Sequence, residues 1–366
     1  MKLAILCNFG PYPTVGGSVG GSEAVIAEIA EGLTKRYGFQ VDIYGHNYSN
    51  ISSYNGINLF PCPKGDSIVD KISNNYSHVF IYSDSQWNIN NIIHNIKSIN
   101  CKISLCLVGA YHMQSHPEIL ELLKKNIDRF SLITHSKTSD YEWCKKNNLP
   151  VRIIPNGVNL QEFKENKIDF REKYSIKEKY IINSTNNFFF GKGFEILPKI
   201  YKKLFNNLDD FIISSVSNSV KYPYDKIFLN RTKNQCKGMN IRFLRDLPRE
   251  DVVAAFQQSD ILMSCSKKEV APLVILESRA SKLPWISMDV GNVKEVSGGI
   301  VISNNNIDHK GYKIVDDKVI DSYASNIIDL LTNKELRQSV IDDGQKNIEK
   351  LDWSNIVPLY NEVFRG

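Results

Sequence analysis

The sequence predicts an α/β protein of two doubly wound domains, each a parallel sheet covered by helices. Three observations predict this fold class. Short apolar runs alternate with segments whose apolar residues recur at helical spacing. The alternation pauses at a polar stretch, residues 161–179, and then restarts. Finally, 366 residues with 42% hydrophobic and 23% charged content suffice for two domains with a core each.

The first domain is expected to cover residues 1–160. Its strands are predicted from apolar runs at 3–7, 41–44, 79–82, 103–108, 131–134 and 151–154. A helix is predicted over 24–35, because five apolar residues from Val25 to Leu33 fall on one helical stripe. Strands separated by helical segments indicate βαβ units, so the strands should run parallel.

The second domain is expected to cover residues 161–345, followed by a C-terminal helical segment, 346–366. Strands are predicted at 180–184, 211–216, 241–244, 261–265 and 285–288, and helices at 194–204, 251–258 and 273–281. A last helix is predicted over 354–364. Pro358 lies inside it and should delay its start or kink it, because proline lacks the N–H of a helical hydrogen bond.

Composition narrows the class of protein only partly. None of the seven cysteines forms a CxxC pair, which disfavours a zinc ribbon, and no apolar run is long enough to span a membrane. We therefore expect a cytoplasmic protein. The net charge of +5 is dispersed; it would suit an anionic donor or acceptor, or peripheral contact with the inner membrane surface.

The clearest chemical signal is a pair of carboxylates, Glu269 and Glu277, around a predicted helix start. Pro272 suits the first turn of that helix, where its missing N–H costs nothing. The backbone N–H groups of Leu273 and Val274 would then form an anion site. An ordinary strand, loop and helix with two solvated glutamates remains the alternative interpretation.

This segment, together with residues 280–286, resembles the EX7E region of glycosyltransferase family 4. Further pieces resemble family motifs in the family's order, and together they span nearly the whole chain: Gly20-Gly21-Ser22-Glu23, Ile153-Ile154-Pro155-Asn156-Gly157-Val158-Asn159, Gly191-Lys192-Gly193, residues 257–264 and the helix after Trp353.

The resemblance implies a GT-B fold: two Rossmann-like domains facing across a cleft, with a C-terminal helix that returns to the first domain. It also implies a retaining, metal-independent transfer of a sugar from a nucleoside diphosphate sugar, UDP- or GDP-linked, without another cofactor. The first domain would bind the acceptor and the second the nucleotide sugar. The acceptor stays open among glycan, lipid, protein and nucleic acid.

Residue roles follow from the same resemblance. Glu269 would hold hydroxyls of the donor sugar, Glu277 the ribose hydroxyls, and Lys192 the diphosphate. The alternative for Lys192 is a solvated lysine at a helix start, which is an unfavourable place for a cation. The remaining residues expected to bind the donor are Gly21, Asn187, Ala271, Leu273, Val274 and Arg245, the last near the base.

Four further candidates come from the loops of the first domain. His112 matches a family histidine near the transferred sugar, with a structural role as the alternative. Asp84, Trp87 and Tyr111 are candidates for acceptor contact. Capping is the preferred alternative for Asp84, whereas packing would explain the two aromatic residues equally well.

One position departs from the family pattern. Asn187 stands where the family has an arginine that pairs with the lysine. Loss of a hydrogen bond to a charged group costs about 1.5–3 kcal/mol, unless Arg279, Lys267 or Lys268 compensates. A weakly active enzyme or a non-catalytic binding protein is therefore the alternative. The EX7E context disfavours a second rival, a nucleotide-sugar epimerase of the same fold.

Overall fold

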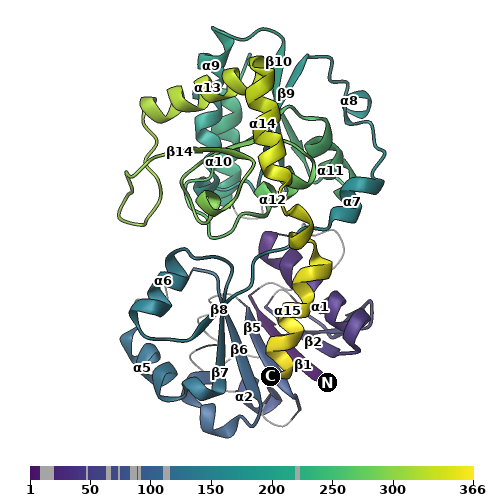
Figure 1. The fold of residues 1–366 in the computed structure, drawn as a ribbon, viewed down its shortest axis with the longest axis vertical. Coiled ribbons are helices and arrows are strands. Elements are labelled where there is room, and N and C mark those ends of the chain that lie inside the picture. The colour runs from purple at the N-terminus through teal and green to yellow at the C-terminus, as the bar shows by residue number, and fades with distance from the viewer. Residues whose placement is uncertain are drawn as a thin grey trace. The chain divides into compact units, whose positions relative to one another are not determined.

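The protein divides into two compact units, each built on a parallel sheet (Figure 1). The computed structural model describes residues 1–8, 20–46, 48–62, 67–72, 75–82, 89, 92–109, 116–218 and 223–366. Unit 1 consists of Met1–Gly157 and Leu351–Gly366, and unit 2 of Val158–Lys350. The predicted class, α/β with two doubly wound domains, is confirmed.

In the described residues the unit 1 sheet has the order β3-β4-β2-β1-β5-β6-β7-β8. All neighbours pair in parallel except β3 and β4. Because β1 lies between β2 and β5, the sheet is wound outward in both directions from its first strand. The strands are β1 Lys2–Cys7, β2 Gln40–Gly45, β3 Ser52–Tyr54, β4 Ile57–Pro61, β5 His78–Tyr82, β6 Lys102–Leu107, β7 Phe130–Thr134 and β8 Val151–Ile153.

The helices of unit 1 are α1 Gly21–Tyr37, α2 Ser67–Ile72, α5 Pro117–Lys125, α6 Ser139–Lys146 and the C-terminal α15 Trp353–Arg365, with 3₁₀ turns η1 Ile96–Ser98 and η2 Ile127–Arg129. Helix α15 packs on α1 (Figure 1). Gly32 permits this approach, because a Cβ there would lie 2.6 Å from Cγ2 of Val357. The expected return of the C-terminal helix to the first domain is confirmed.

Pro358 does not delay the start of α15, so that expectation was wrong: the helix begins at Trp353 and continues through the proline. The proline leaves the carbonyl of Ser354, four residues earlier, without its helical donor. Nη1 of Arg36 on α1 donates to that carbonyl at 2.5 Å. A side chain of the neighbouring helix thus replaces the missing backbone hydrogen bond.

His78 lies in β5 beneath α15. Its Nε2 is 2.8 Å from Oγ of Ser104, and its ring centroid is 4.9 Å from that of Phe364. Burial lowers the pKa of His78 to about 4, so the imidazole is neutral in the folded protein at pH 7.

In unit 2 the described strands follow the order β11-β10-β9-β12-β13-β14, and all neighbours are parallel. The five strands predicted for the second domain are present, each within one residue of its predicted ends, and β14 was not predicted. The strands are β9 Tyr180–Thr185, β10 Phe211–Ser217, β11 Ile241–Arg245, β12 Ile261–Ser264, β13 Trp285–Met288 and β14 Gly299–Ile302.

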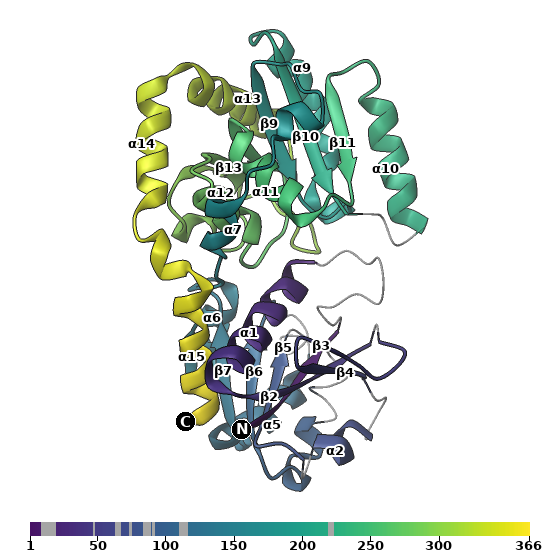
Figure 2. The ribbon, with the colours of Figure 1, turned by 90° about the vertical axis from the view of Figure 1, so that its right-hand side faces the viewer.

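Helices cover both faces of this sheet, and Figure 2 shows α10 beside the edge strand β11. The helix predicted over 194–204 is divided into a 3₁₀ turn and α9. The helices are α7 Leu160–Glu165, α8 Phe170–Lys173, α9 Leu197–Phe205, α10 Pro223–Gln235, α11 Arg249–Gln258, α12 Leu273–Ala280, α13 Asp317–Thr332 and α14 Lys334–Gln345, with turns η3 Phe190–Lys192, η4 Phe194–Ile196, η5 Val293–Glu295 and η6 Ile348–Leu351.

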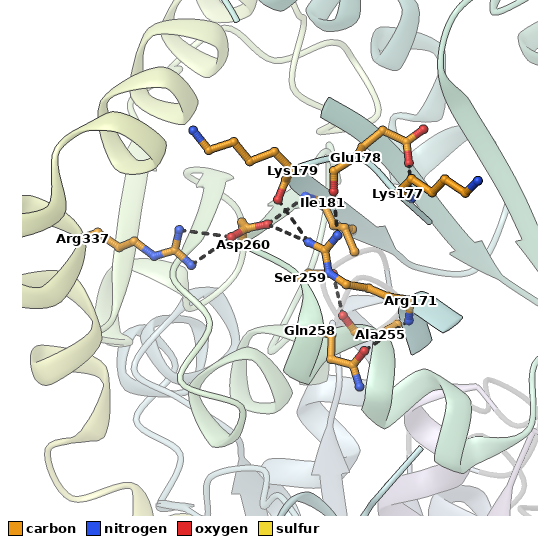
Figure 3. A network of polar contacts seen from close by, with 10 residues as sticks. All are labelled: Arg171, Lys177, Glu178, Lys179, Ile181, Ala255, Gln258, Ser259, Asp260 and Arg337. Carbon is orange, nitrogen blue, oxygen red and sulfur yellow. Dashed lines mark hydrogen bonds and ion pairs between the residues drawn. The ribbon is translucent and has the colours of Figure 1, made fainter. Parts of the chain in front are cut away.

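A polar network stabilises the amino-terminal edge of this sheet (Figure 3). The Asp260 carboxylate, just before β12, lies 3.7 Å from Arg171 and 3.4 Å from Arg337, and it accepts a hydrogen bond from the backbone N–H of Ile181. The network joins α8, α14 and β9. It lies at the opposite end of the strands from the predicted donor site, so we assign it to stability.

Candidate functional site

The topology of unit 2 brings two candidate loops together. Strand β9 leads to Lys192 and strand β12 leads to Glu269, and these strands are parallel neighbours although about 80 residues separate them. Their carboxyl ends therefore meet at one edge of the sheet. Since β9 also pairs with β10 on its other side, this edge is the topological switch point, where ligands bind in doubly wound sheets.

Backbone contacts join the two loops. The backbone N–H of Lys267 donates to the carbonyl of Gly191 at 2.8 Å. Gly193 has φ of +69°, and a Cβ there would lie 1.9 Å from the carbonyl oxygen of Cys265. Only glycine permits both this conformation and this approach. The loop carrying Lys192 is thus fixed against the segment that leads to Glu269.

Lys192 and Glu269 form an ion pair within this frame. The Lys192 Nζ donates to Oε1 of Glu269 at 2.5 Å, and the two side chains are only 15% and 11% exposed. The Phe189 ring lies 5.5 Å from the same ammonium. An ammonium has three N–H donors, so this pair leaves Lys192 able to bind a second anionic group.

The loop after β13 packs against the residue that follows Glu269. The backbone N–H of Asn292 donates to the carbonyl of Val270 at 3.0 Å. Gly291 has φ of +55°, and a Cβ there would lie 2.5 Å from the same carbonyl oxygen. Three strands, β9, β12 and β13, therefore contribute loops to the position of one carboxylate.

Helix α12 begins directly after this loop. Pro272 is its N-cap and Leu273 its first residue, so the proline stands one position earlier than predicted. Among the described residues, neither the N–H of Leu273 nor that of Val274 donates to a backbone carbonyl, whereas the N–H of Ile275 donates to the Pro272 carbonyl. A helix start of this kind carries positive potential and attracts phosphate.

Glu277 lies in the second turn of α12 and is bound to a residue that the sequence did not single out. Oε1 of Glu277 accepts a hydrogen bond from Nη1 of Arg249 at 2.6 Å, and the Glu277 side chain is 14% exposed. The same guanidinium donates to Oε2 of Glu162 at 3.0 and 2.8 Å. No direct signal in the sequence pointed to this arginine, because the helix was predicted to begin at residue 251, whereas α11 begins at Arg249 itself.

Asn187 is held by neutral partners. Its Oδ1 accepts a hydrogen bond from Nδ2 of Asn218 at 2.8 Å. Three cations were considered as compensation for the missing arginine. Arg279, in the last turn of α12, is buried and donates to the carbonyls of Gly344 and Lys346. Lys267 pairs with Glu195 at 2.5 Å. Both are engaged elsewhere, and Lys268 donates to a backbone carbonyl.

The other predicted residues belong to other elements or fall outside the described residues. Gly21 is the first residue of α1 in unit 1. Arg245 of unit 2 is exposed at the end of β11, two strands from β9 in the sheet. Asp84, Trp87, Tyr111 and His112 fall outside the described residues.

Metal sites and membrane-spanning helices would both bear on function. Among the described residues, no group of three or more His, Cys, Asp or Glu side chains could hold a metal ion. In the same residues, no helix has the length and apolar character needed to cross a membrane.

Solved structures of similar fold define the class of the protein. Sucrose-phosphate synthase from Thermosynechococcus elongatus superposes with a TM-score of 0.78 at 15% identity, covering 100% of this chain and 98% of the other. Anabaena HepE in complex with UDP-glucose gives 0.75 at 14%, covering 100% and 99%. A glycosyltransferase from Rickettsia africae gives 0.71 at 16%, covering 100% and 97%. The fold is therefore that of the GT-B proteins.

Sequence comparison then gives the family. Residues 166–347, nearly all of unit 2, match the family described as glycosyl transferases group 1. This region of the chain belongs to the family of glycosyltransferases that the motifs predicted.

Two curated proteins are similar to parts of the chain. N-acetyl-alpha-D-glucosaminyl L-malate synthase of Bacillus anthracis is 23% identical over 259 residues, 68% of this chain and 63% of that protein. D-inositol 3-phosphate glycosyltransferase of Corynebacterium urealyticum is 22% identical over 126 residues, 34% of this chain and 28% of that protein. The chain thus spans less than two-thirds of the length of either relative.

Proposed function

We propose that the protein is a retaining, metal-independent glycosyltransferase that moves a sugar from a nucleoside diphosphate sugar to an acceptor. The observation that carries the proposal is the Lys192–Glu269 pair, 2.5 Å apart, at the carboxyl edge of the unit 2 sheet and next in sequence to the start of α12. A cation, backbone donors and a carboxylate together match a sugar joined to a diphosphate. The similar Anabaena structure is a complex with UDP-glucose, which makes UDP-sugars the first donors to test and GDP-sugars the second.

Each group at this edge has a proposed part in donor binding. The N–H groups of Leu273 and Val274 and the Lys192 ammonium would bind the diphosphate. Glu269 would accept hydrogen bonds from hydroxyls of the sugar, and Glu277 from those of the ribose. The backbone near Arg245 would contact the base, Ala271 would line the donor loop, and Gly21 of unit 1 would approach the phosphate.

The proposed reaction needs no protein base. An acceptor hydroxyl oxygen attacks the anomeric carbon on the face from which the nucleotide departs. The bond between that carbon and the diphosphate oxygen breaks, and the departing phosphate oxygen takes the proton of the acceptor. Lys192 stabilises the negative charge that grows on this oxygen, which lowers the barrier more than it strengthens ground-state binding.

Donor hydrolysis tests the proposal without a known acceptor. Wild-type protein and the Glu269→Ala variant are incubated with UDP-glucose and GDP-mannose, with and without EDTA, and release of nucleoside diphosphate is measured. We expect EDTA-resistant release that the variant loses, with proton NMR showing the α-anomer as the first free sugar. Release of the β-anomer first, or full activity of the variant, would overturn the proposal.

Asn187 supports a second candidate, a nucleotide-sugar-binding protein without turnover. Its neutral side chain, bound to Asn218, supplies no charge to a diphosphate. In that case wild-type protein would bind a donor by calorimetry yet neither hydrolyse nor transfer it.

A further inference from the structure

Arg249 connects two carboxylates from different helices. Through Nη1 it binds Glu277 of α12 at 2.6 Å, and through Nε and Nη2 it binds one oxygen of Glu162 of α7 at 3.0 and 2.8 Å. An arginine presents its donors in a rigid planar fork. Three hydrogen bonds to two fixed partners therefore determine where the guanidinium lies.

Helix α7 holds Glu162 in place independently of Glu277. The side chain of Asn166, just after α7, donates to the carbonyl of Glu250 at 2.9 Å, and Gln257 of α11 donates to the carbonyl of Phe163 at 2.6 Å. The Phe163 ring centroid is 5.9 Å from the Arg249 guanidinium. The guanidinium is thus anchored on the α7 side and can act as a fixed support for Glu277.

The location of Arg249 is costly without these partners. It is the first residue of α11, directly after the N-cap Pro248, where the helix dipole disfavours a cation. The carboxylate it binds on α12 is mostly buried, and that interaction occupies Oε1 of Glu277. Within the described residues, Oε2 of Glu277 accepts no hydrogen bond, which leaves that oxygen for a ligand.

We propose that Arg249 is a positioning residue for donor recognition: it fixes the Glu277 carboxylate through Oε1 so that Oε2 accepts hydrogen bonds from the ribose hydroxyls of the nucleotide. Arg249 itself does not touch the donor. It holds Glu277 in one orientation through the hydrogen bond to Oε1, as an outer partner does for a directly binding group. The inference rests on the proposed function, because it takes Glu277 as the ribose-binding residue.

Discrimination between ribose and dideoxyribose tests this role. Dissociation constants of UDP, GDP and their 2′,3′-dideoxy counterparts are measured by calorimetry on the full chain, for wild type and for Arg249→Met, Arg249→Lys, Glu162→Gln and Glu277→Gln. A matched control is Arg337→Met, which removes an arginine–aspartate pair at the opposite edge of the same sheet (Figure 3). Thermal denaturation of every variant verifies folding.

We expect wild type to bind the ribonucleotide at least tenfold more tightly than the dideoxy form, consistent with loss of hydrogen bonds to a charged group worth about 1.5–3 kcal/mol. Arg249→Met should reduce this ratio to threefold or less while dideoxynucleotide affinity stays within about threefold. Arg249→Lys and Glu162→Gln should give intermediate ratios. Arg337→Met should keep the wild-type ratio.

The measurements distinguish the positioning role of Arg249 from the ribose-binding role of Glu277. If Glu277→Gln loses discrimination and Arg249→Met keeps it, the inference is overturned and the ribose role of Glu277 stands. An equal loss of affinity for both nucleotides in Arg249→Met also overturns the inference, since a merely structural arginine would act in that way. If wild type binds nucleotide without discriminating, the ribose role of Glu277 fails first.

Discussion

Replacement of Lys192 by methionine isolates the charge of its ammonium, because methionine keeps a long unbranched stem. In the structure the ammonium lies 2.5 Å from Oε1 of Glu269, and both side chains are at least 85% buried. Solvent screens such a pair weakly. A donor aimed at charge that develops in a transition state contributes about 2.7–4 kcal/mol. At 1.36 kcal/mol per factor of ten, this corresponds to a loss of about 100- to 1,000-fold in kcat.

The donor KM should change by less than about tenfold in the Lys192→Met variant, because in the proposed site the amides of α12 would still bind the diphosphate. The assay is the initial rate of nucleoside diphosphate release over a range of donor concentrations. Lys192→Arg is the matched variant, which keeps the charge and should retain more of kcat. A Lys192→Met protein with unchanged melting temperature and kcat within threefold of wild type would refute the electrostatic argument.

Three further predictions concern packing around Gly193 in unit 2 and around α15 in unit 1. Gly193→Ala should lower the melting temperature much more than Gly238→Ala. Both glycines have positive φ, so either alanine costs about 1–2 kcal/mol. At Gly193 the new Cβ would in addition clash with the Cys265 carbonyl oxygen at 1.9 Å, whereas at Gly238 no atom lies within 4 Å. Gly32→Ala should destabilise unit 1, and Val357→Ala should relieve part of that loss in the double variant, as thermal melts would show. The pKa of His78 falls to about 4 on folding from an unfolded value near 6.5. Between pH 6.5 and 4 this histidine is protonated in the unfolded chain and neutral in the folded protein. The free energy of unfolding should therefore decrease by about 3 kcal/mol as pH falls from 6.5 to 4. In urea melts at several pH values, the free energy of unfolding of His78→Asn should depend less on pH than that of wild type.

The strand positions were predictable because buried parallel strands are continuous apolar runs. Residues 180–184 and 285–288 were predicted nearly to their observed ends for that reason. Strands β3, β4 and β14 were missed. Strand β3 has no buried residue, and two adjacent glycines, Gly298 and Gly299, obscure the start of β14. Helix α13 was missed although its buried residues, from Val319 to Leu331, follow helical spacing. Helix α14 has no comparable apolar stripe.

The site was predictable only where a motif carries it. Lys192 and Glu269 were placed in one site by resemblance, and the structure brings them into contact. Arg249 was not predicted as part of the site, because its partners Glu277 and Glu162 lie 28 and 87 residues away in sequence. Nothing in the local pattern of an arginine states which distant carboxylate it will bind. Tertiary topology alone supplies that information.

Under the proposed function, the order of the strands gives a physical reason why one lysine would suffice where the resemblance implies two cations. Strand β9 is central, so the loop that follows it has β10 on one side and β12 on the other, and its backbone is bound to the Cys265–Lys267 segment through Gly191 and Gly193. Lys192 is thereby held by main-chain contacts rather than by a second charged side chain. A cation fixed before the donor arrives loses little entropy when it binds a phosphate. The absence of an arginine at position 187 should therefore lower affinity for the diphosphate more than it disturbs the alignment of Lys192 with the leaving oxygen, and the two effects separate as KM and kcat.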